Sequence, residues 1–432
     1  MYSISAATAS ATAVTAAAPR PTVCGLPRRT FWAVAAVLLV GLVVGGTLGG
    51  ILGRRSTDTN TAPQGHSGTS DPPATPKNGT AIAVAARTDT TPADAANADP
   101  DSGFVLIYQT AADALYFVRV KRWQASTPEP LGRDFDAKPH SPLVALSYVP
   151  VGTVPEVQLF YVNRDGHLAD AVLAGDRWTA GKLSEMELHP LASSRLAACV
   201  WYRETLDALW PEVYFQTGDR SVAAYRFFNN NWVTASYPNG NDVVHPRAGS
   251  ALAALFDMAD SGDGNGTLSQ HLRVYSQGTE GAIMSRDFFA GKWSTPYTVY
   301  RADHTISDIG IVARRTANTT LERFSLLFSA SASAEVGDDA DADADAEIGA
   351  DARAGPLHAL TWTNDTAFAS APEVIFAGRA RAAVAGVNPG ADASAAYFQL
   401  RNETDLRQAR LSDAGVWSVT AERIGAPDSS SD

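Results

Sequence analysis

The stretch VQLFYVNRDGHLADAVLAGDRWTAG, residues 157–181, predicts the fold of this chain. Its first six residues alternate and are rich in β-branched and aromatic side chains, which is typical of a strand. The sequence NRDG at 163–166 predicts a turn, HLADAVLA at 167–174 a second strand, and Trp178 opens a third strand after another turn. Because a single hairpin cannot bury its own apolar face, this unit needs neighbours of the same kind.

The unit recurs along the chain, and tryptophans mark the repeats at intervals of 55, 54, 61, 69 and 55 residues. These residues are Trp123, Trp178, Trp232, Trp293, Trp362 and Trp417. The two long intervals contain the insert SGDGNG at 261–266 and an acidic insert at 334–355. A period of roughly 40–50 residues with several short strands per repeat is typical of a β-propeller. We therefore predict an all-β, six-bladed β-propeller with four-stranded antiparallel blades over residues 101–427.

The residues before the propeller divide into three parts. Residues 1–30 are rich in Ala, Ser and Thr and predict a disordered tail. Residues 31–52 form an uninterrupted apolar and glycine run that is long enough to cross a bilayer as one helix. A cleaved signal peptide is the alternative, but its apolar region should be shorter and nearer the start. Residues 53–100 predict a disordered linker rich in Ser, Thr, Pro and Ala.

Glycosylation sequons indicate the orientation of the predicted span. Five of them follow residues 31–52 and none precedes it: Asn78, Asn265, Asn318, Asn364 and Asn402. We expect a single-pass membrane glycoprotein with a cytoplasmic N-terminus and an extracellular or lumenal C-terminal domain. Cys24 and Cys199 would then lie on opposite sides of the membrane, so no internal disulfide can form. Cys24 is either an acylation site or an unmodified thiol beside the membrane.

Charge and motifs exclude several classes of function. The formal net charge of −12 disfavours nucleic acid and anionic membrane surfaces as partners. The histidines are scattered, and a calcium loop starting at Asp263 would have Leu268 and Val274 where Gly and Glu are required, so we expect no metal or other cofactor. The Asp-Ala alternation within 334–355 favours a mobile surface loop over a calcium site. Neither a G-x-S-x-G motif nor a Gly-rich phosphate loop is present, and we expect no catalysis.

The repeat resembles the fungal fucose-specific lectins, which are six-bladed propellers. In that family each repeat reads approximately R-V-Y-Y-Q, a turn, I-x-E, and W-x-x-G, and the resemblance covers residues 101–427. The resemblance implies a sugar pocket between neighbouring blades. There an Arg and a Glu twelve residues apart bind hydroxyl groups. Aromatic side chains of the next repeat cover the apolar face of the sugar.

Two repeats keep polar residues at both of these positions. The second repeat has Gln158 and Asp170, with Phe227 and Trp232 as the aromatic wall. The fourth repeat has Arg273 and Ser285, which face Trp362 of the fifth. These seven residues are the candidate carbohydrate-binding residues that the resemblance implies.

The other repeats depart further from the family pattern. At the positions of the family's Arg and Glu, the first repeat has Val105 and either Tyr116 or Phe117. The third repeat has Glu212 and Ala224 at these positions, facing Phe288 and Trp293. The sixth has Ala395 and Gln408, facing Trp123. The acidic insert interrupts the fifth, and no repeat keeps both Arg and Glu.

Three functions follow from this sequence. The first is a membrane-anchored, lectin-like propeller that binds fucose or a related glycan without catalysis. The second is a scaffold for protein interaction whose sugar sites have been lost. The third is a glycoside-acting enzyme, which ranks last because no pair of carboxylates stands out. The expected partners are a glycan and, through residues 31–52, a membrane.

Overall fold

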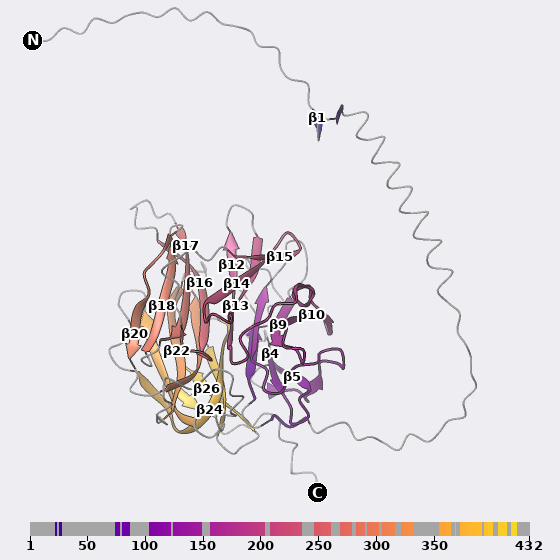
Figure 1. Ribbon diagram of the computed structural model, residues 1–432. Helices are drawn as coiled ribbons and strands as arrows, with labels where there is room; N and C mark the ends of the chain where they lie inside the picture. The colour runs from indigo at the N-terminus through magenta and orange to yellow at the C-terminus, as the bar shows by residue number, and fades with distance from the viewer. Residues whose placement is uncertain are drawn as a thin grey trace, which may run out of the picture. The chain divides into compact units, whose positions relative to one another are not determined.

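The structure is a computed structural model that describes a defined part of the chain (Figure 1). The described residues are 22–23, 26–27, 74–77, 80–86, 103–121, 124–148, 156–203, 208–235, 246–260, 268–278, 282–289, 292–301, 305–315, 321–331, 354–363, 368, 372–390, 393–400, 405–412 and 416–420. The predicted span at 31–52, Trp123 and all five sequon asparagines lie outside these residues. Among the residues that are described, no helix is long and apolar enough to cross a membrane.

The chain divides into two compact units, Met1–Ser70 and Asp71–Asp432. In the first unit, strands β1 (Thr22–Val23) and β2 (Leu26–Pro27) form an antiparallel pair. The second unit contains every other described element and all the candidate site residues.

The described strands of the second unit form antiparallel sheets in which neighbours in sequence are neighbours in space. Blade 1 contains β3 (Ile82–Ala86), β4 (Phe104–Gln109), β5 (Leu115–Lys121) and β6 (Gln124–Ala125), with β7 (Glu129–Pro130) also pairing with β5. Blade 2 contains β8 (Leu143–Tyr148), β9 (Glu156–Val162), β10 (Leu168–Ala174) and β11 (Arg177–Ala180), followed by the short 3₁₀ helix η2 (Leu183–Met186). Blade 3 contains β12 (Leu196–Arg203), β13 (Ala208–Gln216), β14 (Val222–Phe228) and β15 (Asn231–Thr234).

The remaining strands form one five-stranded and one seven-stranded sheet within the described residues. Blade 4 contains β16 (Leu252–Asp260), β17 (Leu268–Gln277), β18 (Ala282–Phe289) and β19 (Lys292–Trp293), with β20 (Tyr297–Arg301) also pairing with β18. The seven-stranded sheet contains β21 (Thr305–Arg315), β22 (Leu321–Ser331), β23 (Ala354–Thr363), β24 (Glu373–Gly390), β25 (Ala393–Leu400), β26 (Leu406–Leu411) and β27 (Trp417–Val419).

Strand β24 is shared by two blades, so the seven-stranded sheet contains both of them. Its first part, Glu373 to Arg381, pairs with β23, and its later part, from Ala380 to Gly390, pairs with β25, so that the two pairings overlap at Ala380 and Arg381. It is therefore both the outer strand of blade 5 and the inner strand of blade 6. The two blades that share it complete a set of six.

Each pair of neighbouring blades encloses a buried apolar cluster, and the described residues include six such clusters. One of them joins Ile82, Phe104 and Tyr108 of blade 1 to Tyr397 and Leu406 of blade 6. Because the first and last blades share this core, the blades close into a ring. Figure 1 shows the indigo and yellow ends of this unit meeting in the same body, in agreement with the contact of β3 with β24.

A repeated polar contact joins neighbouring blades at three of the six junctions within the described residues. The glutamine that ends a second strand donates its side-chain amide to a backbone carbonyl just before the next blade: Gln109 to Lys138, Gln216 to Arg247 and Gln399 to Lys77. The last of these three bonds joins blade 6 to the segment before blade 1. The Gln in the YFQ-type sequences is thus a structural residue, because it satisfies buried carbonyl groups between blades.

The predicted start of the propeller at residue 101 needs a correction. Strand β3 lies inside the predicted linker at 53–100, and it pairs with β4 along its whole length. The tyrosine hydroxyl of Tyr108 also donates to the Ala74 carbonyl at 2.8 Å. The sequence IAVAA is short and rich in Ala, like the segments around it, so composition alone could not distinguish it from linker. Of the predicted acidic insert, only residues 354 and 355 are described, and they begin β23.

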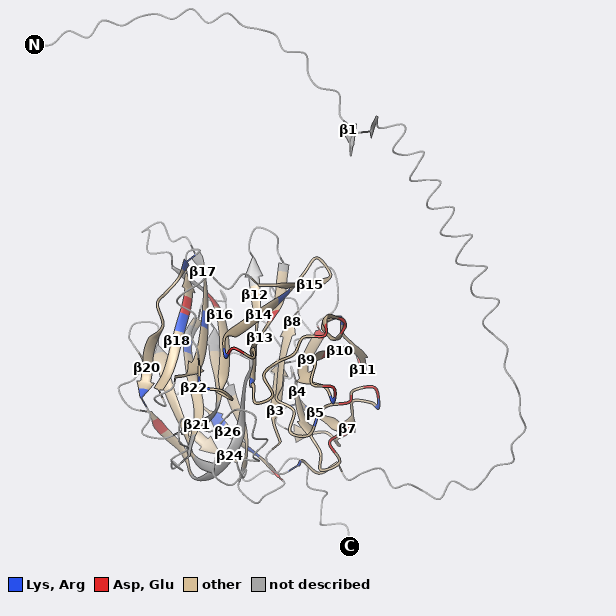
Figure 2. Cartoon of the chain, viewed as in Figure 1, with Lys and Arg blue, Asp and Glu red and all other residues tan. Residues whose placement is uncertain are grey.

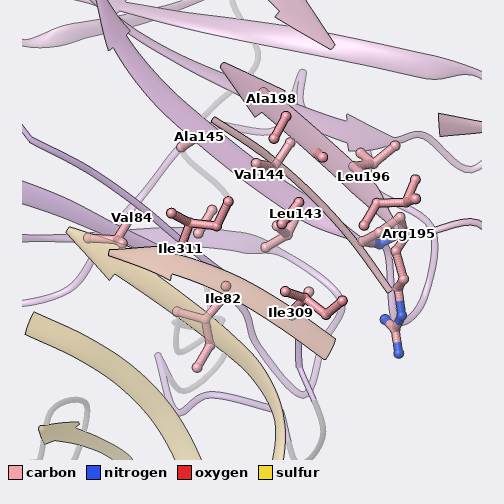
Figure 3. Close-up of a pocket in the computed structure, with 18 residues that line it drawn as sticks. Ile82, Val84, Leu143, Val144, Ala145, Arg195, Leu196, Ala198, Ile309 and Ile311 are labelled. Carbon is pink, nitrogen blue, oxygen red and sulfur yellow. The ribbon is translucent and has the colours of Figure 1, made fainter. Parts of the chain in front are cut away.

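The first strand of each blade faces the axis of the ring. Inner strands of blades 1 to 5 line a central cavity of about 160 Å³, with aliphatic side chains such as Ile82, Leu143, Leu196 and Ile309 around it (Figure 3). The guanidinium group of Arg195 lies at one edge of this cavity. Most of the strand residues in the view of Figure 2 are uncharged, and the coloured charges gather at strand ends and on β17 and β18. Charged side chains inside the sheets are therefore exceptions, and each of them requires a paired group or a bound ligand to offset the cost of its burial.

Candidate functional site

A cavity of about 430 Å³ lies between blades 3 and 4. Its size is within the range of small-molecule sites. It is lined by Trp201, Trp210, Glu212, Arg226, Phe228, Val233, Thr234, Ala235, Phe288 and Trp293. Five of these ten residues are aromatic, and two are charged.

Strand register explains why the blade 3 residues meet in one place. Trp201 on β12 lies opposite Trp210 on β13, and Glu212 lies opposite Arg226 on β14. Because side chains alternate along a strand, Trp210 and Glu212 share one face of the sheet, and Arg226 and Phe228 share the same face one strand further out. This face packs against blade 4.

An ion pair forms the polar part of the cavity. The Arg226 Nε donates to Glu212 Oε2 at 2.5 Å, and the Tyr214 hydroxyl donates to Glu212 Oε1 at 2.5 Å. The Glu212 side chain is 2% exposed and the Arg226 side chain 22%. Burial raises the pKa of Glu212, while the charge of Arg226 and the two hydrogen bonds act in the opposite direction. Glu212 thus lies behind Arg226 and holds it in place.

Aromatic rings fix the plane of the guanidinium group. The Arg226 Cζ lies 4.0 Å from the ring centroid of Trp201 and 6.0 Å from that of Trp210, both within the range of cation–π contacts. Trp201 is buried and also packs against Phe256 and Phe288 of blade 4. One face of the guanidinium group is therefore covered, and its Nε edge is occupied by Glu212.

Blade 4 supplies the opposite wall. Phe288 on β18 and Trp293 on β19 are paired across the two strands, and their ring centroids are 5.4 Å apart. Trp293 is one of the repeated tryptophans, and it is the last residue of the short outer strand of its blade. A polar group on blade 3 thus faces an aromatic wall on blade 4, an arrangement that suits a ligand with both polar and apolar faces.

The predicted pair Gln158 and Asp170 forms a buried contact between β9 and β10. Gln158 Nε2 donates to Asp170 Oδ2 at 2.6 Å, and the backbone N–H of Leu183 donates to Asp170 Oδ1 at 2.9 Å. Asp170 is 1% exposed, and burial raises its pKa to about 6. A Cβ added at Gly181 would collide with this carboxylate, so the backbone after β11 lies directly over it. Both oxygens of Asp170 and Nε2 of Gln158 are therefore occupied by contacts within the protein, whereas Oε1 of Gln158 is buried without a hydrogen bond within the described residues.

The predicted aromatic wall of that pair is also part of the core. Trp232 packs against Phe160 of blade 2, with ring centroids 5.7 Å apart, and against Phe227, with centroids 5.4 Å apart. Trp232 is 6% exposed. The structure therefore places these residues at one blade interface, where they pack against each other.

The second predicted group, Arg273 with Ser285 and Trp362, is brought together only in part. The Arg273 Cζ lies 5.0 Å from the ring centroid of Trp362 and 5.4 Å from that of Phe324. Ser285 instead donates to Asp287 Oδ1 at 2.6 Å. Arg273 is 6% exposed and lies against two rings of blade 5, with Asp257 Oδ2 3.9 Å from its Nη1. Trp362 lies on the third strand of its blade, whereas Trp178, Trp232, Trp293 and Trp417 lie on outer strands.

A buried polar network surrounds Arg273. Asp287 lies opposite Arg273 on the neighbouring strand, and it accepts a hydrogen bond from the Tyr297 hydroxyl at 3.0 Å and contacts His271 Nε2 at 3.2 Å. Although burial opposes the shift, hydrogen bonds from His271 and Ser285 lower the pKa of Asp287. Asp287, His271, Ser285 and Tyr297 are thus paired with each other, whereas Nη1 of Arg273 is buried without a hydrogen bond within the described residues.

The sequence pattern did not point to Arg226, Trp201 or Trp210. The family pattern places the Arg on the second strand, and here the second strand has Glu212 while Arg226 is on the third. A search for oppositely charged residues on paired strands, rather than for Arg at a fixed position, would have found this pair. In the other repeats, Val105, Phe117 and Ala395 are buried apolar residues, and Gln408 donates to the Tyr397 hydroxyl.

Comparison with known proteins identifies related propellers, although no family model matches the chain. The fucose-specific lectin of Aleuria aurantia is 26% identical over 160 residues, which are 37% of this chain and 46% of the lectin. The matched region thus spans about half the length of that curated relative. Since this relative is a lectin, the homology is to a non-catalytic protein.

Solved structures resemble the chain over a larger region. The crystal structure of the Aleuria aurantia lectin, described as a six-bladed β-propeller, matches with a TM-score of 0.56 and 15% identity over 81% of this chain and 97% of the lectin. The structure of AofleA from Arthrobotrys oligospora matches with a TM-score of 0.57 and 15% identity over 81% of this chain and 87% of AofleA. These matches confirm the predicted fold. The chain is a distant homologue of the Aleuria aurantia fucose-specific lectin family and an all-β, six-bladed β-propeller.

Proposed function

We propose that this propeller binds carbohydrate without catalysis, at the cavity between blades 3 and 4. The observation that supports this most directly is the guanidinium group of Arg226, which lines a cavity of about 430 Å³ opposite Phe288 and Trp293. Sugars have hydroxyl groups on some edges and apolar C–H faces between them. The guanidinium group of an arginine donates hydrogen bonds to the hydroxyl groups, and an aromatic ring covers the apolar C–H face.

The distant homologues make a sugar the preferred ligand. One solved relative is the Aleuria aurantia lectin in complex with alpha-methyl-L-fucoside, and another is the same lectin in complex with Fucalpha1-6GlcNAc. Fucose, or another sugar in a glycan, is therefore the first ligand class to test for this chain.

A scaffold for protein interaction is the second candidate. It is favoured by the burial of Gln158, Asp170 and Arg273, because these three polar residues at family-type positions are at most 6% exposed and have little surface open to a ligand. If the cavity between blades 3 and 4 were also without a ligand, the propeller would act through its outer surface.

A glycan-array screen distinguishes these two functions. The full-length chain would be tested beside a Glu212→Gln/Arg226→Met double variant and an Arg273→Met variant, all checked for folding by circular dichroism. Changing both members of the ion pair avoids an unpaired buried charge, which would itself destabilise the fold. We expect binding that is lost in the double variant and kept in Arg273→Met. If the folded wild-type chain bound no glycan on the array, the result would instead favour the scaffold function.

We also propose that residues 31–52 anchor the chain in a membrane and that the sequons at Asn78, Asn265, Asn318, Asn364 and Asn402 are glycosylated on the extracellular or lumenal side. The length of the apolar run and the position of all sequons after it support this proposal. Extraction of cell membranes with alkaline carbonate tests the anchor, which predicts that the chain stays in the pellet. A mobility shift after endoglycosidase treatment tests the orientation.

A further inference from the structure

We propose that the cavity between blades 3 and 4 binds its sugar through a carboxylate group, so that the preferred ligand is an acidic sugar such as a hexuronic acid. This inference rests on the proposed carbohydrate-binding function and names the ligand class of the same site. It follows from which hydrogen-bonding groups of the cavity are already occupied.

The one carboxylate among the described lining residues is not open to a ligand. Both oxygens of Glu212 accept hydrogen bonds within the protein, from Arg226 and from Tyr214, and its side chain is 2% exposed. A neutral sugar presents mainly hydroxyl groups, which need acceptors as well as donors. Glu212 therefore holds Arg226 from behind and does not serve as the acceptor for a neutral sugar.

Arg226 presents one remaining edge to the cavity. Its Nε is bonded to Glu212, and one face of the group lies on Trp201 at 4.0 Å. Its side chain is 22% exposed and lines the cavity, so the two terminal amino groups form the open edge. This edge is a planar pair of donors, whose geometry matches a carboxylate with two parallel hydrogen bonds.

The other lining residues add little polar chemistry. Among the lining residues that the structure describes, the side chains other than those of Glu212 and Arg226 are aromatic or aliphatic, with the exception of Thr234. A sugar hydroxyl can accept a hydrogen bond from the guanidinium edge, but its own O–H finds few acceptors among the described lining residues, which is unfavourable. A carboxylate brings its own acceptors to the guanidinium edge, and the sugar ring can lie on Trp293 and Phe288. The described lining therefore favours a ligand that is rich in acceptors at one end and apolar at the other.

Calorimetric titration with matched pairs of sugars tests this inference. Each pair differs only at C6, where the acid carries a carboxylate and the neutral sugar a hydroxymethyl group: methyl glucuronide with methyl glucoside, methyl galacturonide with methyl galactoside, and methyl mannuronide with methyl mannoside. Methyl α-L-fucoside is the fourth neutral probe. We expect at least one acid to bind the full-length chain ten-fold or more tightly than its neutral partner and than the fucoside.

Two conservative variants locate the effect. Arg226→Lys keeps the positive charge and loses the planar fork, so we expect the preference for the acid to fall at least ten-fold. Arg164→Lys is the matched control, because Arg164 is 59% exposed and pairs with Asp136 in a turn of blade 2. This control should bind all probes like the wild type.

The outcomes separate this inference from the proposed function. Binding of an acid that is preferred over its neutral partner and depends on Arg226 supports both. Binding of the fucoside or another neutral sugar as tightly as any acid overturns the acidic-sugar inference and leaves carbohydrate binding intact. A folded wild-type chain that binds none of the seven probes and no glycan on the array overturns both.

Discussion

The interfaces on the two sides of blade 4 each contain an arginine beside aromatic rings, and they differ in what surrounds it. Between blades 3 and 4, Arg226 lines a cavity and its side chain is 22% exposed. Between blades 4 and 5, the Arg273 side chain is 8% exposed and lies against Phe324 and Trp362. Arg273 matches the family pattern in sequence, whereas Arg226 does not. Identity at a motif position therefore does not decide whether a site is open.

The strand on which each arginine lies explains the difference. Arg273 is on the second strand of its blade and Arg226 on the third. Blades radiate from the central axis of a propeller, so the gap between two neighbours widens outward. A guanidinium group on the third strand therefore has more space in front of it than one on the second. The aromatic wall follows the same order, because Trp362 beside Arg273 lies on a third strand, one strand further in than Trp293, which lies on a fourth.

The largest effect is expected from Trp362→Ala. The ring of Trp362 stacks on Phe324 at 5.2 Å and covers Arg273, so its removal leaves a cavity and should lower the free energy of unfolding by about 3 kcal/mol. Urea denaturation measures this loss. Trp293→Ala is the matched variant: we expect a smaller loss of stability but the loss of sugar binding, because Trp293 already borders a cavity. Equal destabilisation by the two variants would contradict the contrast between a closed and an open interface.

The closed interface between blades 2 and 3 contains a buried carboxyl group, that of Asp170, whose titration should change stability. Burial raises the pKa of Asp170 from 3.8 to about 6 in the folded state. Between these values the folded chain holds a proton that the unfolded chain has lost, so stability falls as pH rises through this window. Two pH units correspond to about 3 kcal/mol, as an order of magnitude.

Stability of the wild type and Asp170→Asn at pH 4, 5, 6 and 7 tests this sign. The wild type should lose more stability than the variant between pH 4 and 6, and the two curves should run parallel above pH 7. A wild type that instead gains stability relative to Asp170→Asn over this range would show that Asp170 is ionised at pH 4 and that its hydrogen bonds outweigh burial.

The smallest effect is expected from Gln399→Leu. This substitution tests the closure of the six blades into a ring, on which both interfaces depend. Gln399 Nε2 donates to the Lys77 carbonyl at 3.2 Å, and the substitution leaves that carbonyl without this donor. We expect a loss of about 1 kcal/mol in the free energy of unfolding, with sugar binding unchanged. Thermal unfolding with and without ligand measures both quantities. A variant that kept its stability but lost binding would show that ring closure acts on the site directly.

The fold was largely predictable from the sequence because the repeat is regular. Trp178, Trp232, Trp293 and Trp417 all lie on short outer strands, and the YFQ-type sequences all form second strands. Strand β3 was not predictable, since IAVAA resembles the Ala-rich residues around it. Trp362 has the expected spacing, but it lies on a different strand from the other tryptophans because blade 5 takes its outer strand from the long β24.

The candidate site was much less predictable than the fold. The resemblance directed attention to Gln158, Asp170 and Arg273, whose residue types fit sugar binding. Their burial depends on how the neighbouring backbone and aromatic rings pack around them, and a sequence motif carries no information about that packing. In this chain the acidic residue, Glu212, lies on the second strand and the arginine, Arg226, on the third, the reverse of the family pattern. A search for Arg and Glu at the family's fixed positions therefore misses this charged pair.

A crystal structure of the chain with its tightest-binding sugar tests the central claim most directly. We expect sugar density between blades 3 and 4, in contact with the terminal amino groups of Arg226 and against the ring of Trp293. Density beside Arg273, or at another interface while the cavity between blades 3 and 4 stays empty, would contradict it.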